Sequence, residues 1–245
     1  MTIRTHKPAF FDQLTDTSSD NKKGEIRLLV VLDWLYRWRY ASQQILVDLL
    51  TVTDTKGEAA SIRAALRRWD NKFIRSFTLA TDISRVGYVL KADGIFKLSM
   101  AQPNRAFTKP FTETSSLTTS AAKRHDLTVQ AAVIHMLRHG YLKYASEWEY
   151  RDGTAGKIFD AVIENADKYR IGIEVEMTPK NAGILRDAIA AADYAVRQKA
   201  VDSVLYMVPT PALERTIKRA IADVNAVNVA VKVSEKVAKM AGVRQ

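Results

Sequence analysis

The chain has 245 residues, of which 47% are apolar and 26% charged, so it is long enough to bury the core of one large or two modest globular domains. It contains no cysteine, which excludes disulfides, thiolate zinc sites and cysteine nucleophiles and fits a reducing cytoplasm. The net charge of +10, shared between both halves of the chain, favours contact with a polyanion such as nucleic acid.

Neither a membrane span nor a signal peptide is expected. The longest unbroken aliphatic run, residues 28–32, is far too short to cross a bilayer. The first residues, MTIRTHKPAFFDQLTD, contain no apolar signal core. We therefore expect a cytoplasmic protein that does not insert into membranes.

A winged helix-turn-helix domain is predicted at residues 24–100, after a polar, flexible arm at residues 1–23. Apolar residues recur at helical spacing in three successive segments, and Ser42 stands where it can cap the second helix. Two strand-like runs follow at the spacing of a hairpin, which completes the order of elements in such domains. The helices are expected at 25–39, 41–50 and 58–73, and the strands at 76–80 and 86–90.

Residues 101–120 are expected to form a linker, because this stretch holds two prolines and many Ser and Thr residues. In the following residues, 121–233, helical and strand-like segments predict a mixed α/β domain around a central sheet, followed by a basic helical tail at 234–245. The helices are expected at 121–139, 179–199 and 211–224, and the strands at 144–150, 158–164, 170–177, 203–208 and 228–233.

The third helix carries a basic face. Ile62, Leu66, Trp69 and Phe73 recur at helical spacing and form its buried stripe, which leaves the arginines on other faces. A helix at this position in the fold can enter the major groove, with the hairpin adding phosphate contacts. A solvated basic face on an ordinary helical domain is the alternative. The candidate DNA-binding residues are Arg63, Arg67, Arg68 and Lys72 near this helix and Arg85 on the hairpin.

Three acids interrupt apolar runs in the second half of the chain. Asp160 lies in one strand-like run, and Glu174 and Glu176 lie in the next, IGIEVEM. Because side chains alternate along a strand, both glutamates project from the same face as Gly172, which leaves open space beside them. The opposite face is expected to pack inward through Ile171, Ile173, Val175 and Met177.

These acids predict a cation site. Three converging carboxylates repel one another unless a cation lies among them. Mg²⁺ or Mn²⁺ takes carboxylate, water and phosphate oxygens, and can polarise a phosphodiester. The alternative is a hairpin with a wet face, on which acids need no special role.

This arrangement resembles the PD-(D/E)XK, or restriction-endonuclease-like, nuclease fold. The resemblance lies in the order helix–strand–strand–strand–helix–strand, with Asp on one strand and Glu-x-(Glu/Lys) on the next. Together with the winged helix and the segment KRHDLTVQAAVIHML, residues 25–233 are similar to the MobC-type relaxases of mobilizable plasmids, which are related to replication-relaxation proteins. The resemblance implies nicking of one strand of supercoiled plasmid DNA at the transfer origin, together with a coupling protein of a secretion system. No small-molecule substrate is expected.

By position, the resemblance makes Asp160, Glu174 and Glu176 the catalytic acids that bind Mg²⁺ or Mn²⁺. Nucleases of this fold often carry lysine where this chain has Glu176. Lys180 can supply a replacement ammonium group, or Glu176 can hold a second metal ion. His125 is a possible accessory residue that faces the acids from the start of its helix.

The sequence is compatible with other mechanisms and functions. Most relaxases use a tyrosine nucleophile and a His-hydrophobic-His metal site, but no such histidine pair occurs here, which favours metal-assisted scission without a covalent tyrosine. A non-enzymatic DNA-binding regulator of plasmid replication or partition is the main alternative function. A restriction-type enzyme would need two active sites and hence a dimer. The candidate tyrosines are Tyr141, Tyr144, Tyr150, Tyr169 and Tyr194.

Overall fold

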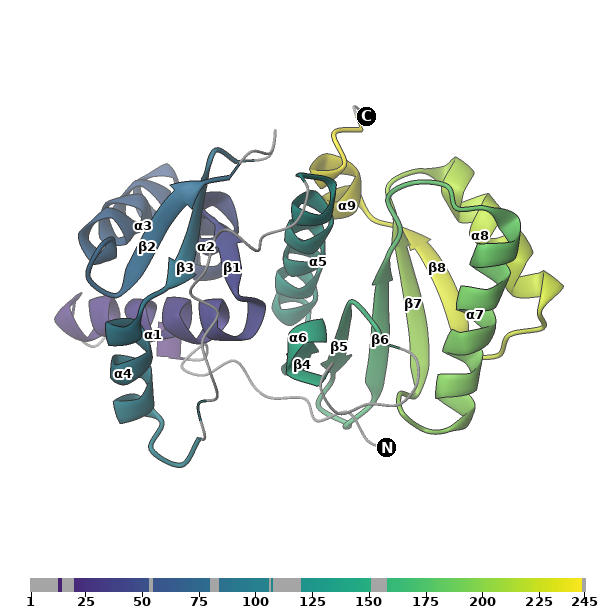
Figure 1. Cartoon of the computed structure of the whole chain (residues 1–245), viewed down its shortest axis with the longest axis horizontal. Helices are drawn as coiled ribbons and strands as arrows, with labels where there is room; N and C mark the ends of the chain where they lie inside the picture. Colours follow the sequence, from purple (N-terminus) through teal and green to yellow (C-terminus); the bar gives the residue numbers. More distant parts are fainter. Residues whose placement is uncertain are drawn as a thin grey trace. The chain divides into compact units, whose positions relative to one another are not determined.

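The computed structural model describes residues 13–14, 20–52, 55–79, 84–105, 107, 120–150 and 158–243. It is a mixed α/β structure with a three-stranded and a five-stranded sheet (Figure 1). The described residues divide into two compact units, one reaching to Lys123 and the other beginning at Arg124. No helix in these described ranges is both long and apolar enough to cross a membrane.

The N-terminal unit combines helices with a small antiparallel sheet. β3 is the central strand and pairs with β1 on one side and β2 on the other. Inward-facing side chains of the helices and of β3, among them Leu32, Trp34, Leu46, Leu66 and Leu90, form its core. The elements are α1 (Asp20–Trp38), β1 (Tyr40–Ser42), α2 (Gln43–Leu50), α3 (Lys56–Trp69), β2 (Ile74–Thr78), β3 (Val86–Leu90) and α4 (Ala92–Ala101).

Side-chain caps fix where two of these helices begin. The Ser42 hydroxyl accepts a hydrogen bond from the Ile45 amide at 3.1 Å, which confirms the cap predicted for the second helix. The Thr55 hydroxyl does the same for α3, accepting from the Glu58 amide at 3.2 Å. Both caps satisfy amides that have no partner inside the helix.

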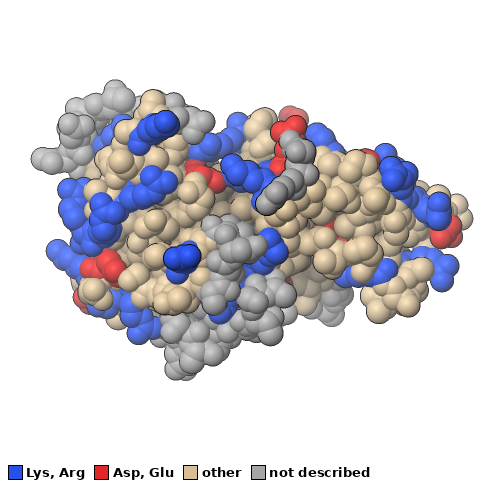
Figure 2. Space-filling model, turned by 90° about the horizontal axis from the view of Figure 1, so that it is seen from above, with Lys and Arg blue, Asp and Glu red and all other residues tan. Residues whose placement is uncertain are grey.

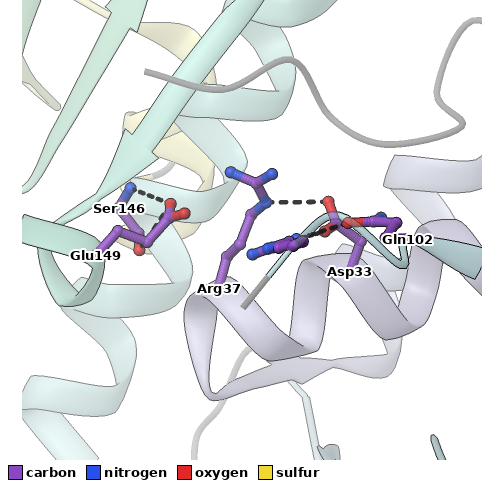
Figure 3. A network of polar contacts seen from close by, with 6 residues as sticks. Asp33, Arg37, Gln102, Ser146 and Glu149 are labelled. Carbon is purple, nitrogen blue, oxygen red and sulfur yellow. Dashed lines mark hydrogen bonds and ion pairs between the residues drawn. The ribbon is translucent and has the colours of Figure 1, made fainter. Parts of the chain in front are cut away.

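A charged network joins α1 to the segment after α4. Asp33 is buried and accepts hydrogen bonds from Arg37 at 3.0 Å and from Arg105 (Figure 3). The Arg105 guanidinium also stacks over the ring of Tyr36, 4.8 Å from its centroid. The first residues of the expected linker therefore pack against α1. Figure 3 also shows Glu149, which in the other unit accepts a hydrogen bond from the Ser146 amide at 3.0 Å.

Several expected boundaries in this unit were wrong. Residues 20–23, expected in the arm, form the first turn of α1, and Tyr40–Ser42 pairs with β3 as a strand instead of beginning the second helix. The third helix ends at Trp69, so Phe73 lies in the following turn. α4 was not expected. The rest of the arm except residues 13–14, most of the linker and the tip of the hairpin lie outside the described residues.

The C-terminal unit is built on the five-stranded sheet, in the order β4-β5-β6-β7-β8. The first three strands are antiparallel to one another, and β6, β7 and β8 are parallel. The elements are α5 (Ser120–Arg138), β4 (Lys143–Ser146), α6 (Glu147–Tyr150), β5 (Ala161–Glu164), β6 (Arg170–Val175), α7 (Ala182–Arg197), β7 (Ser203–Val208), α8 (Pro211–Asp223), β8 (Val229–Val233) and α9 (Glu235–Met240).

Helices cover both faces of this sheet: α7 and α8 lie on one face, and α5 and α9 on the other (Figure 1). The core against α7 and α8 includes Val162, Val204 and Tyr206 from the strands and Leu185 and Ile217 from the helices. Since the side chains of a strand alternate, the residues between them face α5. A parallel sheet covered on both faces is expected to be apolar on both, so a charged side chain within it requires a partner.

The sequence predicted most of these elements, with four corrections. The strand expected at 170–177 ends at Val175, so Glu176 lies just after it. The strand expected at 144–150 ends at Ser146, where α6 begins. The strand expected at 158–164 begins only at Ala161, so Asp160 lies just before it. The helix expected from Pro179 begins at Ala182, because Asn181 is its cap and accepts a hydrogen bond from the Gly183 amide.

Candidate functional site

The three acids do meet in the structure, at one end of the central strands. The first residue of β5 pairs with Ile173, so Asp160, directly before it, lies beside Glu174. Glu174 in turn pairs with Tyr206 on β7. Glu176 follows the end of β6, where its amide donates to the Met207 carbonyl at 3.1 Å. Alternation places all four side chains on one face of the sheet.

The alternative of a hairpin with a wet face required this face to be exposed to solvent, and it is not. Glu174 and Glu176 are only 9% and 6% exposed, because α7 and α8 cover their side of the sheet. Gly172 does not leave open space either, since a Cβ atom there would lie 2.8 Å from the Phe159 ring. The expectation that Gly172 leaves open space beside the glutamates was therefore wrong. Carboxylates buried to this extent need compensating partners.

His125 of α5 holds Asp160 in place. Its Nε2 lies 3.3 Å from Asp160 Oδ2 and 3.0 Å from the Val175 carbonyl oxygen. The Val175 amide donates a hydrogen bond to the same Asp160 oxygen at 2.7 Å. Burial lowers the pKa of His125, but hydrogen bonds to Asp126, Asp160 and the Val175 carbonyl outweigh burial and raise this pKa to about 11. His125 is thus a cation at neutral pH.

Lys180 supplies a second positive charge. Its Nζ atom lies 2.5 Å from Oε2 of Glu176, which precedes Lys180 by four residues in the sequence. Burial lowers the pKa of Lys180, but the hydrogen bond and charge of Glu176, together with the charges of Glu174 and Asp160, raise this pKa overall. The charges of all three carboxylates therefore act on the Lys180 ammonium group. Two cationic side chains therefore lie among the three acids.

Tyr206 belongs to this cluster, although the sequence did not identify it. Its side chain is 1% exposed, and its hydroxyl has no hydrogen-bond partner among the described residues. Burial and then the charges of Glu174, Glu176 and Asp160 raise its pKa, so the hydroxyl stays protonated. Alternation within SVLYMV gave a signal for the face of Tyr206, but its place beside Glu174 depends on the pairing of β6 with β7.

Three of the candidate tyrosine nucleophiles lie away from this cluster. Tyr144 is fully buried on the opposite face of the sheet, where it pairs with Ile163. Tyr169 and Tyr194 are exposed, at 42% and 61%, in the turn before β6 and on α7. These three candidate tyrosines therefore lie away from the acids.

A divalent cation fits the chemistry of these donors but not their arrangement as it stands. In the described ranges, no group of three or more His, Asp or Glu side chains has the spacing of a metal site. Carboxylate oxygens are nevertheless the ligands that Mg²⁺ and Mn²⁺ take. Asp160, Glu174 and Glu176 are the residues that would hold the ion.

The basic residues of the N-terminal unit lie around the end of α3. Arg67, Arg68 and Lys72 are exposed, as is Arg85 before β3, whereas Arg63 is half-buried. Ile62 and Leu66 form the buried stripe, but Trp69 and Phe73 are only partly buried. Figure 2 shows Lys and Arg side chains spread over the visible face of the molecule, with few acids among them. This surface suits a polyanion.

Comparison of the chain with protein-family models, with curated proteins and with solved structures gives no match.

Proposed function

We propose that this protein is a DNA-nicking enzyme of plasmid mobilization, in which the N-terminal unit binds the DNA and the C-terminal unit cuts one strand. The observation that carries this proposal is the convergence of Asp160, Glu174 and Glu176 at the ends of adjacent strands. The order of α5, three antiparallel strands, α7 and β7 supports the restriction-endonuclease-like reading. So does the resemblance to MobC-type relaxases.

In this proposal the three acids would hold Mg²⁺ or Mn²⁺, and the bound ion would supply Lewis-acid polarisation of a phosphodiester and activation of water. His125 and the Val175 amide fix the orientation of Asp160. Lys180 balances the charge of Glu176 and presents its ammonium group to the phosphate or the water. The protonated, buried Tyr206 is a poor nucleophile, which favours hydrolysis over a covalent tyrosine intermediate.

The N-terminal unit would be a winged helix, with α3 as the recognition helix and the β2–β3 hairpin as its wing. Arg63, Arg67 and Arg68 on α3 would reach base edges or phosphates, and Lys72 and Arg85 the flanking backbone. The transfer origin as target, the supercoiled plasmid as substrate and a coupling protein as partner follow from the resemblance.

A non-enzymatic regulator of plasmid replication or partition is the second candidate. It is favoured by the ion pairs of the acids, since His125 and Lys180 already balance two of the three charges without a metal ion. In such a protein the cluster would stabilise the unit, and DNA binding would need no divalent cation. A retained fold does not by itself require retained activity.

The experiment is incubation of supercoiled plasmid carrying the transfer origin with the full-length protein, in Mn²⁺, Mg²⁺ or EDTA. Glu174→Gln removes one acid, and Glu214→Gln on the surface of α8 is the matched control. We expect open circles that require the metal and are lost only in Glu174→Gln. Linear product would indicate a restriction-type enzyme. DNA binding without cleavage in either metal would favour the regulator.

A further inference from the structure

One face of α4 exposes large apolar side chains. The helix packs against α1 and buries Gly94 and Leu98 (Figure 1). At 3.6 residues per turn, a position two residues further along a helix lies on nearly the opposite side. Phe96 and Met100 occupy these opposite positions and are 68% and 69% exposed. They are one helical turn apart and therefore form a patch, which is typical of a surface that contacts another molecule.

A groove lies beside these two side chains. It has a volume of about 530 Å³ and is formed by α1, α4 and the turn after α3. Leu29 and Phe73 give it an apolar lining, and Phe96 and Met100 belong to its α4 side. This α4 groove is larger than a phenylalanine side chain, so it has room for an apolar side chain of another molecule.

The charges that line the α4 groove are of both signs. Glu25 and Asp93 are acidic, and Lys72 and Lys97 are basic. The Lys97 ammonium group pairs with Glu25 at 2.8 Å, and the Lys72 ammonium group lies 5.1 Å from the centroid of the Phe73 ring. A nucleic acid would require a basic surface, and a basic peptide would require an acidic one. Equal numbers of acids and bases instead make this surface complementary to a second copy of itself.

We propose that two copies of this chain form a homodimer through their α4 grooves, with Phe96 and Met100 of each copy packed into the groove of the other. A two-fold axis brings the same surface of both copies together, so that surface must carry both projecting side chains and the hollow that receives them. The α4 groove carries both. The inference goes beyond the proposed function and does not depend on it, because the acids of the C-terminal unit take no part.

The dimer is expected to be weak, with a dissociation constant on the order of micromolar, because an interface centred on one helix of 10 residues is small. Sedimentation equilibrium of the full-length protein, from nanomolar to hundreds of micromolar concentrations, measures it. Phe96→Asp and Met100→Asp each place a charge at the centre of the interface and should stay monomeric throughout. Ile184→Asp on α7 replaces a similarly exposed apolar residue, at 61%, and should dimerise as wild type does.

Folding of these variants is checked by thermal unfolding at a concentration where the wild type is monomeric. Since Phe96 and Met100 are largely exposed, their replacement should leave the unfolding midpoint unchanged. A second measurement keeps the native side chain of Phe96. The chain has no cysteine, so Met100→Cys introduces a single thiol. A short bismaleimide should link Met100→Cys into dimers, but not the control Ile184→Cys.

The charges allow the self-complementarity to be tested directly. Lys72→Glu with Lys97→Glu makes the charges around the groove all acidic, and Glu25→Lys with Asp93→Lys makes them all basic. Each double variant should be monomeric alone, because like charges then face one another across the two-fold axis. An equal mixture of the two should form a heterodimer. A mixture that stays monomeric overturns the inference.

Three other results would also overturn it. A wild type that stays monomeric at hundreds of micromolar leaves the α4 groove to a different protein or to another segment of this chain. A dimer that persists in Phe96→Asp and Met100→Asp forms through another surface. Equal cross-linking of Met100→Cys and Ile184→Cys reflects random collisions and not a defined interface.

Discussion

Lys180 and His125 supply the positive charge that the buried carboxylates require, and both come from outside the two strands that carry the acids. His125 lies on α5 and Lys180 in the segment before α7. A divalent cation at the same carboxylates would compete with the Lys180 ammonium group, since both neutralise the same charge. In the proposed function, Lys180 would therefore lower the affinity of the site for a metal ion.

The substitution Lys180→Gln is expected to tighten Mn²⁺ binding by about fivefold. Lys180 is 44% exposed, so solvent screening reduces its repulsion of the ion to about 1 kcal/mol. Nicking should nevertheless fall, since the ammonium group no longer faces the phosphate. The measurement is a Mn²⁺ titration beside a nicking assay. Lys218→Gln, which breaks a similar ion pair with Glu214 on α8, is the control. Unchanged affinity in Lys180→Gln would show that Lys180 does not compete with the ion.

Asp193 lies on α7, away from the three acids. It allows the contribution of a single ionised side chain to the stability of the fold to be tested. Burial raises its pKa, but the Val227 amide, at 2.7 Å, and Arg197, at 2.6 Å, outweigh burial and lower it below 3.8. A carboxyl group whose pKa is lower in the folded than in the unfolded state stabilises the fold at pH values above its unfolded-state pKa. This contribution is lost as the pH falls through the folded-state pKa.

Asp193→Asn should therefore lower the free energy of unfolding by about 1–3 kcal/mol at pH 7, with a smaller loss as the pH falls below 3.8. Urea unfolding of both proteins at neutral and acidic pH measures the difference. Asp187→Asn, an exposed acid on the same helix, should change little. A penalty independent of pH would mean that packing, not the charge, makes Asp193 stabilising.

At the scale of elements, α3 would determine how the N-terminal unit contacts DNA in the proposed function. Arg67 and Arg68 are exposed on its last turn, and neither forms an ion pair that the structure records. Replacing either by alanine should weaken DNA binding several-fold and reduce the slope of log affinity against log salt by about 1. Fluorescence anisotropy at several salt concentrations measures both. Lys218→Ala, on α8 of the other unit, should leave the slope unchanged, and a similar loss there would indicate nonspecific attraction.

Elements that local sequence determines were predictable. The apolar periodicity of α1, α5 and α8 gave these helices, and alternation together with a short turn gave the β5–β6 hairpin. β1 was missed because three residues carry little pattern and become a strand only through pairing with β3. α4 was missed because it contains Gly94, which the fold needs where the Phe73 carbonyl approaches to within 2.3 Å of a Cβ position.

In the candidate site too, features set by local sequence were predictable, and features set by contacts between distant residues were not. Strand alternation was enough to place Glu174 and Glu176 on one face, and the hairpin was enough to bring Asp160 to them. The burial of that face was not predictable, because α7 and α8 cover it through contacts distant in sequence. Tyr206 was missed for the same reason, as it joins the acids only through the parallel pairing of β7 with β6.

At the scale of the whole molecule, two units with separate cores divide the proposed work. The net charge of +10 raises the affinity of the chain for DNA in general, whereas α3 would supply selectivity and the acids the chemistry. The proposed function therefore depends most on whether a divalent cation binds where β5 begins and β6 ends.

The most direct measurement is to load the full-length protein with Fe²⁺, add ascorbate and peroxide, and map by mass spectrometry where radicals generated at the ion cut the polypeptide. Fe²⁺ binds the same oxygen ligands at least as tightly as Mn²⁺. The account predicts cuts close to Asp160 and to Glu174 and Glu176, suppressed by excess Mn²⁺ and absent from Glu174→Gln. Cuts elsewhere in the chain, or cuts that persist in Glu174→Gln, would contradict it.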